Sequence, residues 1–228
     1  MKKNKKFIAI IAVMALFVLS ILSACIGKYS SGYVFENGTW NYVSYDAAVG
    51  RRVNPIDVDK DEFQELKYKD FARDNENVYF KSRKIEGSDP DTFEVISTAD
   101  RRSYAKDKNN VYIYIKDDWG VYKIINADPT TFEVLDFPYA KDKNDAYNGT
   151  LPLFVDDVSK FEVIEGAGMS TSTSAEYFLT TVTRSEEEAK YNKEKYGDIE
   201  GAILYSSEGK AKTDKLVYEG YMVVEDNR

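Results

Sequence analysis

The chain has 228 residues, of which 31 are basic and 39 acidic, with one cysteine and no histidine. The missing histidine removes the commonest general acid–base group and the commonest metal ligand. A lone cysteine excludes an internal disulfide and the usual zinc sites. The acidic balance argues against nucleic acid as a partner, because nucleic acid binds basic surfaces.

The first 24 residues have the layout of a secretory signal sequence. Four lysines are followed by an uncharged, apolar-rich run from Phe7 to Leu22, and Ser23 and Ala24 precede Cys25. This run of 16 residues is short for a bilayer, since a spanning helix needs about 20. We therefore expect a cleaved signal. The alternative is an uncleaved N-terminal membrane helix in which the cysteine has no special role.

The residues Leu22, Ser23, Ala24 and Cys25 resemble the lipobox that lipoprotein signal peptidase reads. The resemblance implies a diacylglyceryl group on the Cys25 sulfur, cleavage before Cys25 and acylation of the new amine, for example with palmitate. Two or three acyl chains give stable anchoring. Residues 25–32 would form a lipidated tether, and Ile26 in place of aspartate favours the outer membrane of a two-membrane bacterium. The mature chain carries 27 basic and 39 acidic residues, a net charge of −12.

One motif then occurs three times. It reads YKDFARDNENVY at residues 68–79, YAKDKNNVY at 104–112 and YAKDKNDAY at 139–147. Asp and Asn between two aromatic or β-branched runs are typical of turns, because their side chains bond the nearby backbone. Each copy therefore predicts two short strands joined by a turn.

The second copy continues into a longer hairpin. Residues 111–116 alternate between aliphatic and tyrosine side chains, which predicts a strand. Residues 117–120 then turn the chain into a second strand at 121–125. In the third copy, Asn148 and Gly149 stand at the equivalent place and are a strong hairpin signal.

A second motif occurs after each of these three copies. It reads GSDPDTFEVI at 87–96, NADPTTFEVL at 126–135 and DDVSKFEVI at 156–164, with a degenerate copy at 59–66. Asp89 and Asp128 are expected to cap a single helical or 3₁₀ turn. Phe93, Phe132 and Phe161 would then enter the core, and a return strand would begin after each.

The phenylalanines of the second motif, at positions 63, 93, 132 and 161, are 30, 39 and 29 residues apart. The sequence thus predicts a mainly β fold, an antiparallel meander of hairpin repeats of about 30–39 residues that are stable only together. The paired motifs resemble the DKNYY family, a repeat family of bacterial exported proteins without an established molecular function. The resemblance covers residues 33–165, and it brings no catalytic residues with it.

The C-terminal part follows a Gly-, Ser- and Thr-rich linker or loop at 166–174. Residues 175–228 are expected to form a β-α-β-β segment outside the repeat, with strands near 177–183, 202–205 and 216–224. Its helix should begin at Ser185 as N-cap, with Glu188 completing a capping box, and end at Gly197.

Two sites are considered for metal and for catalysis. The turns that begin at Asp107 and Asp142 resemble the opening of calcium loops, but they lack the later Gly and Glu of such loops. The turn interpretation needs only the residues present, so no metal and no cofactor are expected. A pair of carboxylates could catalyse glycoside hydrolysis, but no motif singles out a pair, and we expect no catalytic residues and no enzyme.

A tyrosine-lined surface is the remaining candidate. Tyr79, Tyr112, Tyr114 and Tyr122 could stack on sugars or peptides, or they could pack inside a two-faced sheet. Trp119, at the tip of the longest hairpin, is the aromatic residue for which packing is the less automatic role.

Taken together, these patterns predict an exported protein anchored in the cell membrane through Cys25. Its expected role is a non-catalytic binding module for a protein or glycan partner, without nucleic acid. The alternative is an immunity or inhibitor lipoprotein that neutralises a basic exported toxin or enzyme, since charge complementarity raises association rates.

Overall fold

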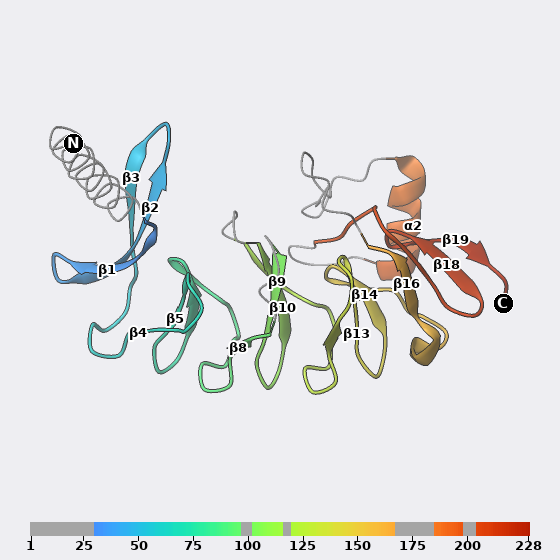
Figure 1. The fold of residues 1–228 in the computed structure, drawn as a ribbon, viewed down its shortest axis with the longest axis horizontal. Helices are drawn as coiled ribbons and strands as arrows, with labels where there is room; N and C mark the ends of the chain where they lie inside the picture. Colours follow the sequence, from blue (N-terminus) through green and yellow to red (C-terminus); the bar gives the residue numbers. More distant parts are fainter. Residues whose placement is uncertain (1–29, 97–101, 116–119, 167–184, 198–203) are drawn as a thin grey trace, which may run out of the picture. The chain divides into compact units, whose positions relative to one another are not determined.

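The computed structural model describes residues 30–96, 102–115, 120–166, 185–197 and 204–228. The chain divides into two compact units. In the described residues, unit 1 holds 30–75 and 79–84, and unit 2 holds 76–78 and the residues from 85 onward. The expected fold class is confirmed: the described chain is mainly β, with small antiparallel sheets, short capped turns and one short helix, α2 (Glu186–Tyr196) (Figure 1).

Unit 1 begins with a three-stranded antiparallel sheet of β1 (Gly32–Glu36), β2 (Thr39–Asp46) and β3 (Gly50–Pro55). Asn37 and Gly38 form the two-residue loop between β1 and β2, both with positive φ (56° and 80°). Asn-Gly is favoured in such hairpins because these residues tolerate that backbone conformation. The face with Tyr33 and Trp40 packs on Phe63, whose ring centroid lies 5.2 and 4.7 Å from theirs.

Four further sheets share one plan of four antiparallel strands. The first holds β4 (Gln64–Glu65), β5 (Phe71–Arg73), β6 (Val78–Phe80) and β7 (Arg83–Lys84). The second holds β8 (Glu94–Val95), β9 (Arg102–Lys106), β10 (Val111–Ile115) and β11 (Val121–Lys123). The third holds β12 (Glu133–Val134), β13 (Tyr139–Lys141), β14 (Ala146–Asn148) and β15 (Leu151–Pro152). The fourth holds β16 (Glu162–Glu165), β17 (Lys210–Lys212), β18 (Leu216–Glu219) and β19 (Met222–Asp226).

A capped turn stands before the first strand of the later sheets, as the second motif predicts. The Asp89 carboxylate accepts from the N–H of Thr92, and Asp128 accepts from Thr130 and Thr131. In the last copy the turn is the 3₁₀ helix η1 (Val158–Lys160), capped by Asp157. The phenylalanine that follows each turn is buried at Phe161, whereas Phe93 and Phe132 are only half-buried against neighbouring tyrosine rings.

The sheets of unit 2 share hydrophobic cores. One core joins the second and third sheets, with Ile113 and Tyr122 packed near Tyr147. The next joins the third and fourth sheets, with Tyr139 and Tyr218 in one cluster. Both faces of the third sheet are therefore covered: Ala140 and Tyr147 lie in the first of these cores, and Tyr139 and Ala146 lie in the second. In β10, Val111, Tyr112, Ile113 and Tyr114 are all buried.

The C-terminal part belongs to the fourth sheet and does not form a separate sheet. β16, which precedes the predicted linker, pairs directly with β17, which follows it. Residues 166–209, 44 in number, stand between these strands, whereas four stand between β12 and β13. The predicted strand at 216–224 is a hairpin of β18 and β19. Residues 204 and 205 are not in a strand, and 177–183, 202 and 203 lie outside the described residues.

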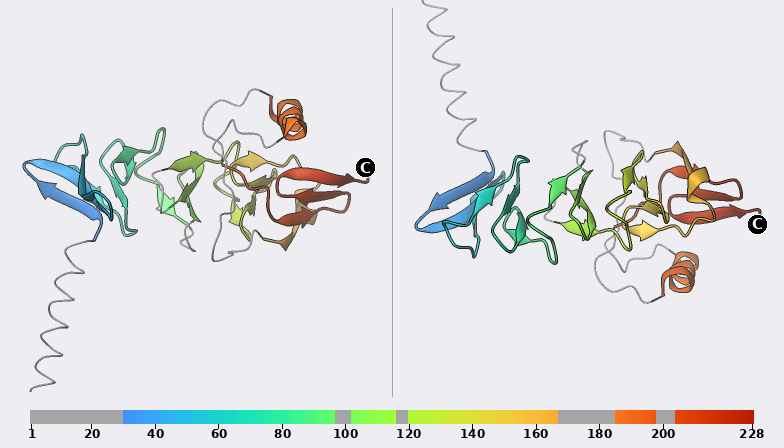
Figure 2. Two further views of the ribbon diagram at one scale, coloured as in Figure 1. Left: turned by 90° about the horizontal axis from the view of Figure 1, so that it is seen from above. Right: turned by 90° about the horizontal axis from the view of Figure 1, so that it is seen from below.

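The helix is confirmed. Ser185 accepts a hydrogen bond from the N–H of Glu188, and Gly197 ends α2 at a φ of 64°. Figure 2 shows α2 to one side of the C-terminal strands. In the described ranges, no helix has both the length and the apolar character needed to cross a bilayer.

Candidate functional site

The first recurring arrangement is built around Asp107, the aspartate of the second YAKDKNNVY-type turn. Its Oδ1 accepts from the N–H of Asn109 and Asn110 at 2.7 and 2.8 Å. Its Oδ2 accepts from the N–H of Asp89, at 3.0 Å, and from the Tyr112 hydroxyl, at 2.9 Å. A side chain that is only 3% exposed thus ties the turn to the preceding capped turn.

Asp142 repeats this geometry one sheet later. Its Oδ1 accepts from Asn144 and Asp145, at 2.7 and 3.0 Å, and its Oδ2 accepts from Asp128 N–H and the Tyr147 hydroxyl, at 2.6 and 2.8 Å. Burial, followed by the hydrogen bond to the carboxylate, raises the pKa of Tyr147 above its ordinary value. The same causes act on the pKa of Tyr112. Protonated tyrosines therefore serve as permanent donors here.

The geometry favours the turn interpretation of Asp107 and Asp142 over a calcium loop. Each carboxylate oxygen already accepts two hydrogen bonds from the protein. Within the described part of the chain, no group of three or more Asp, Glu, His or Cys side chains is arranged to hold a metal ion.

The prediction that four tyrosines line an exposed surface is wrong. Tyr79, Tyr112, Tyr114 and Tyr122 are 1, 2, 3 and 6% exposed, so they belong to the core. In β10, Val111 and Ile113 on one face and Tyr112 and Tyr114 on the other are all buried, so neither set of alternating side chains lies at the surface. Trp119 lies outside the described residues, as do Leu22, Ser23, Ala24 and Cys25.

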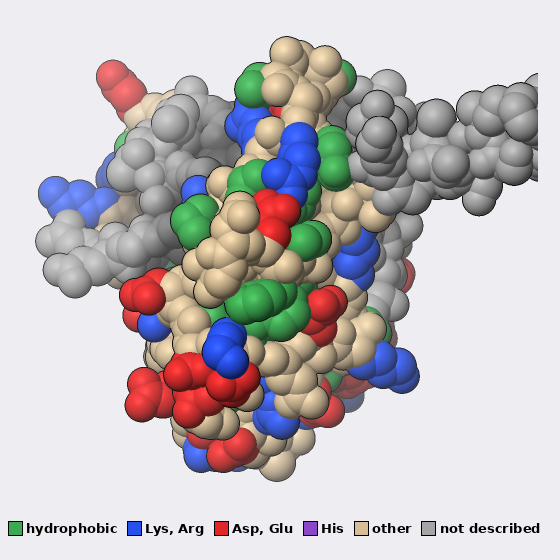
Figure 3. Space-filling model, turned by 90° about the vertical axis from the view of Figure 1, so that its left-hand side faces the viewer, with side chains coloured by type: hydrophobic (Ala, Val, Ile, Leu, Met, Phe, Trp, Pro, Cys, Tyr) green, Lys and Arg blue, Asp and Glu red, His purple; other side chains and the backbone are tan. Residues whose placement is uncertain are grey.

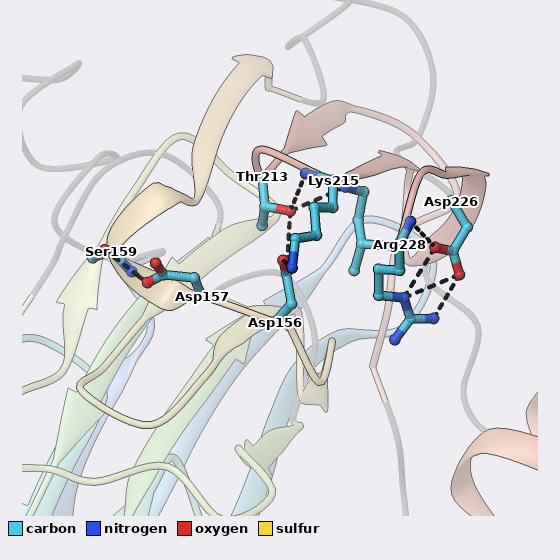
Figure 4. Close-up of polar contacts among 8 residues, drawn as sticks. Asp156, Asp157, Ser159, Thr213, Lys215, Asp226 and Arg228 are labelled. Carbon is cyan, nitrogen blue, oxygen red and sulfur yellow. Dashed lines mark hydrogen bonds and ion pairs between the residues drawn. The ribbon is translucent and has the colours of Figure 1, made fainter.

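The fourth sheet departs from the aspartate pattern. Residues 210–218, KAKTDKLVY, align with YAKDKNNVY, so Thr213 stands where Asp107 and Asp142 stand in the earlier copies. The Thr213 hydroxyl donates to Asp156 at 2.7 Å, and Lys215 lies 3.9 Å from the same carboxylate (Figure 4). Tyr218 occupies the position of Tyr112, and its buried hydroxyl has no hydrogen-bond partner among the described residues.

Helix α2, within the long insertion of this fourth copy, is fastened to the sheet by polar contacts. Glu188 is 5% exposed, and its Oε1 accepts from the Tyr221 hydroxyl at 2.7 Å. The Tyr196 hydroxyl donates to the carbonyl of Pro152 at 3.1 Å. The end of the insertion returns to the third sheet, where Thr150 N–H donates to the carbonyl of Leu204 at 2.7 Å.

The contact between Leu204 and this turn requires glycine at position 149. Its φ is 59°, and an added Cβ would lie 2.1 Å from the carbonyl oxygen of Leu204. The predicted Asn148-Gly149 hairpin is present, with Gly149 and Thr150 as its two loop residues between paired Asn148 and Leu151. The chain at Leu204, near the end of the insertion, therefore packs directly on this turn.

Lys195 of α2 stands in a group of aromatic rings. Its Nζ lies 5.1 to 5.9 Å from four ring centroids, those of Phe154, Tyr191, Tyr196 and Tyr218. It also donates to the Tyr191 hydroxyl at 2.7 Å. Burial lowers the pKa of Lys195 to about 8, against the opposing effect of Asp145. We call Phe154, Tyr191, Lys195 and Tyr196 the aromatic–lysine cluster.

Phe154 gives this cluster an exposed edge. Its side chain is 52% exposed, and its φ of 54° is unusual for a bulky residue. The backbone is held there by Asp145, whose carboxylate accepts from the N–H of Phe154 and Val155 at 2.9 and 3.0 Å. Burial raises the pKa of Asp145, although its backbone hydrogen bonds oppose the shift.

A second candidate is a polar hollow of about 290 Å³ between consecutive copies in unit 2. Lys106 spans it, with its Nζ 3.1 Å from the carbonyl of Pro129 and 3.5 Å from Glu94. Cross-strand pairs of Lys141 with Glu133 and Lys212 with Glu162 stand at the equivalent register in the next two sheets. The recurrence of this pair marks it as part of the repeat.

The aromatic–lysine cluster was missed from the sequence. Tyr191 and Lys195 are four residues apart on one helix, a spacing that places side chains together, and this was the available signal. Nothing in the sequence pointed to Phe154, because its unusual backbone depends on Asp145 nine residues earlier. Chemically, the cluster offers a cation, apolar rings and a partly neutral amine, a combination suited to binding.

The sequence model of the DKNYY family matches residues 3–116 and 112–227. The two matches extend beyond the 33–165 range of the motif resemblance and include the fourth sheet. Neither a curated protein nor a solved structure matched the chain. The two tandem matches show that the chain belongs to the DKNYY family.

Proposed function

We propose that the chain is a lipid-anchored binding protein of the bacterial cell envelope. In this proposal, residues 1–24 direct export, Cys25 carries the lipid, and the protein resides in the outer membrane where the bacterium has two membranes. The layout of the first 25 residues supports export and lipidation. The part of the protein beyond the tether binds a protein or glycan and carries out no reaction.

The aromatic–lysine cluster is the proposed contact site, and Phe154 is the observation that carries the proposal. A non-glycine residue in the left-handed region costs about 1–2 kcal/mol. Packing offsets only part of this cost, since about half of Phe154 faces solvent. Strained residues cluster at binding sites, and an exposed aromatic beside a cation is a common contact element.

Site-directed photocrosslinking tests this site. A photoreactive phenylalanine analogue replaces Phe154 in the lipidated protein in its own cells, and a matched variant carries it at Ile164, which is 57% exposed. We expect one discrete crosslinked partner at 154 and none at 164. Equal crosslinking at both positions, or none at either, would contradict the proposed contact site.

The alternative function is an immunity or inhibitor lipoprotein that neutralises a basic exported toxin or enzyme. The mature net charge of −12 is the observation that favours it, because complementary charge accelerates association. Ionic strength separates the two functions once a partner is identified. Association of a basic toxin should slow steeply with added salt, whereas binding to the aromatic–lysine cluster should change little.

The non-catalytic part of the proposal has its own test. The purified mature protein is incubated with a broad panel of glycan, peptide and phosphate-ester substrates. We expect no turnover above buffer. Turnover that survives repurification would overturn the binding-protein proposal in both of its forms.

A further inference from the structure

Exposed apolar side chains gather in the three-stranded sheet of β1, β2 and β3, which we call the N-terminal sheet. Seven large hydrophobic side chains are exposed among the described residues, and four of them lie between positions 34 and 53. These are Val34, Phe35, Val49 and Val53, with exposed fractions of 39, 44, 64 and 41%. Figure 3, in which this sheet lies towards the viewer, shows hydrophobic side chains at the surface among charged ones.

The strand register places Val34 and Phe35 beside the β1–β2 loop, and Val49 in the turn at the other end of β2. Val34 and Val53 share a face, because the pairs Val34–Asn41 and Val43–Val53 fall on strand positions of the same parity. Val49 lies in the β2–β3 turn, where its N–H donates to Asp46. Phe35 is on the opposite face, 5.5 Å from the Trp40 ring. The sheet therefore exposes apolar groups on both of its faces and at the β2–β3 turn.

The charge of this sheet differs from that of the rest of the mature chain. Residues 25–55 carry three basic and two acidic side chains, a net charge of +1. Residues 56–228 carry 24 basic and 37 acidic side chains, a net charge of −13. Within the sheet, Arg51 pairs with Glu36 at 2.7 Å and Arg52 with Asp46 at 3.5 Å. An anionic bilayer surface would repel the acidic residues 56–228 and tolerate only the N-terminal sheet.

The proposed anchor is joined directly to this sheet. Seven residues, 26–32, separate Cys25 from Tyr33, and such a chain spans at most about 25 Å when fully extended. A lipid on Cys25 would therefore hold the N-terminal sheet close to the bilayer. A net charge of +1, exposed apolar groups and proximity to the proposed anchor coincide in one sheet.

We propose that the sheet of β1, β2 and β3 lies on the lipid surface, with Val34 and Phe35, beside the β1–β2 loop, among the headgroups and upper acyl chains. This inference rests on the proposed lipid anchor at Cys25. The lipid fixes the protein to the membrane, and the sheet adds a second contact with the lipid surface close to the anchor.

The test uses the single cysteine of the chain. Once the Cys25 sulfur is lipidated, an introduced cysteine is a unique free thiol for an environment-sensitive dye. Phe35→Cys places the dye on the N-terminal sheet, and Ile164→Cys, also at an exposed position, is the matched control in β16. The full lipidated protein is reconstituted in phosphatidylcholine vesicles and in vesicles that also contain phosphatidylglycerol.

We expect the emission of the dye at position 35 to rise about twofold or more on reconstitution, as for a probe that enters the interface. A lipid-borne headgroup quencher should reduce this emission, and the dye at 164 should stay accessible to aqueous iodide. A second variant, Val34→Asp in the Phe35→Cys protein, should restore iodide access at 35. It adds charge to a side chain that is already exposed, so folding is retained.

The outcomes separate the two proposals. If the protein floats with the vesicles but the dyes at 35 and 164 respond alike to both quenchers, the sheet does not contact lipid and this inference is wrong, while the anchor stands. If the protein does not float at all, the lipid anchor itself is wrong, and the contact of the sheet falls with it.

Discussion

The aspartate that joins successive turns is expected to dominate the stability of each repeat. Replacing Asp107 with Ala removes the acceptor of four hydrogen bonds from a side chain that is 3% exposed. The Tyr112 hydroxyl is buried and the Asp89 N–H partly buried, so both lose a partner that water replaces poorly. Each buried unpaired donor costs about 1–3 kcal/mol.

The two turn amides, of Asn109 and Asn110, are nearer to solvent and add roughly 0.5–1 kcal/mol between them as charge-assisted bonds are lost. The total for Asp107→Ala is therefore about 3–5 kcal/mol, the range for removing one member of a buried ionic hydrogen-bond group. For a protein of this size, 1 kcal/mol shifts the midpoint by roughly 2–4 °C. We expect the midpoint to fall by roughly 10 °C.

Thermal and urea unfolding of the mature protein, followed by circular dichroism, measure this effect. Tyr112→Phe removes one donor and leaves the Asp89 N–H bonded, so it should cost only about 1 kcal/mol. Lys108→Ala removes an exposed ion pair with Asp89 and should cost less than about 0.5 kcal/mol. A loss below about 1 kcal/mol for Asp107→Ala would refute the assignment of Asp107 as the junction between turns.

The remaining predictions concern the fourth copy, its helix and metal. The folded pKa of Lys195 is about 8, below its unfolded value, so the unfolded chain binds more protons and stability should rise from about pH 8 to pH 10. Lys195→Met should flatten that rise in urea titrations at several pH values; an unchanged slope would contradict the burial of the amine. Thr213→Asp should destabilise the protein, because its carboxylate would meet Asp156, whereas adding Asp156→Ala should recover roughly 1 kcal/mol by giving the Tyr218 hydroxyl an acceptor. A double variant no more stable than the single one would argue against this. Millimolar calcium should leave the unfolding midpoint unchanged, and a rise with metal would revive the calcium loop.

Local signals accounted for most of the repeat. Asp-Asn turns and the Asp-Pro caps act through neighbouring atoms, so their residues predict these contacts locally. The Asn148-Gly149 signal located the hairpin, although its loop residues are Gly149 and Thr150. Asp89 and Asp128 cap their turns, and Ser185 caps α2, as the sequence predicts. The family resemblance followed from the same local motifs.

The fourth sheet was not predicted, for two physical reasons. Thr213 replaces the junction aspartate, so the motif loses its most distinctive residue. In addition, residues 166–209 separate β16 from β17, and strand pairing across such a distance leaves no local pattern. The burial of Tyr112 and Tyr114 also escaped prediction, because alternation shows that a strand has two faces and not whether both are covered.

The central claim is that this DKNYY protein is anchored by lipid on Cys25, and mass spectrometry of the mature N-terminus tests it most directly. The N-terminal peptide from the membrane fraction should begin at Cys25 and carry a diacylglyceryl thioether, which Cys25→Ser should abolish. An N-terminus at Met1, or cleavage elsewhere with an unmodified Cys25 thiol, would contradict the account.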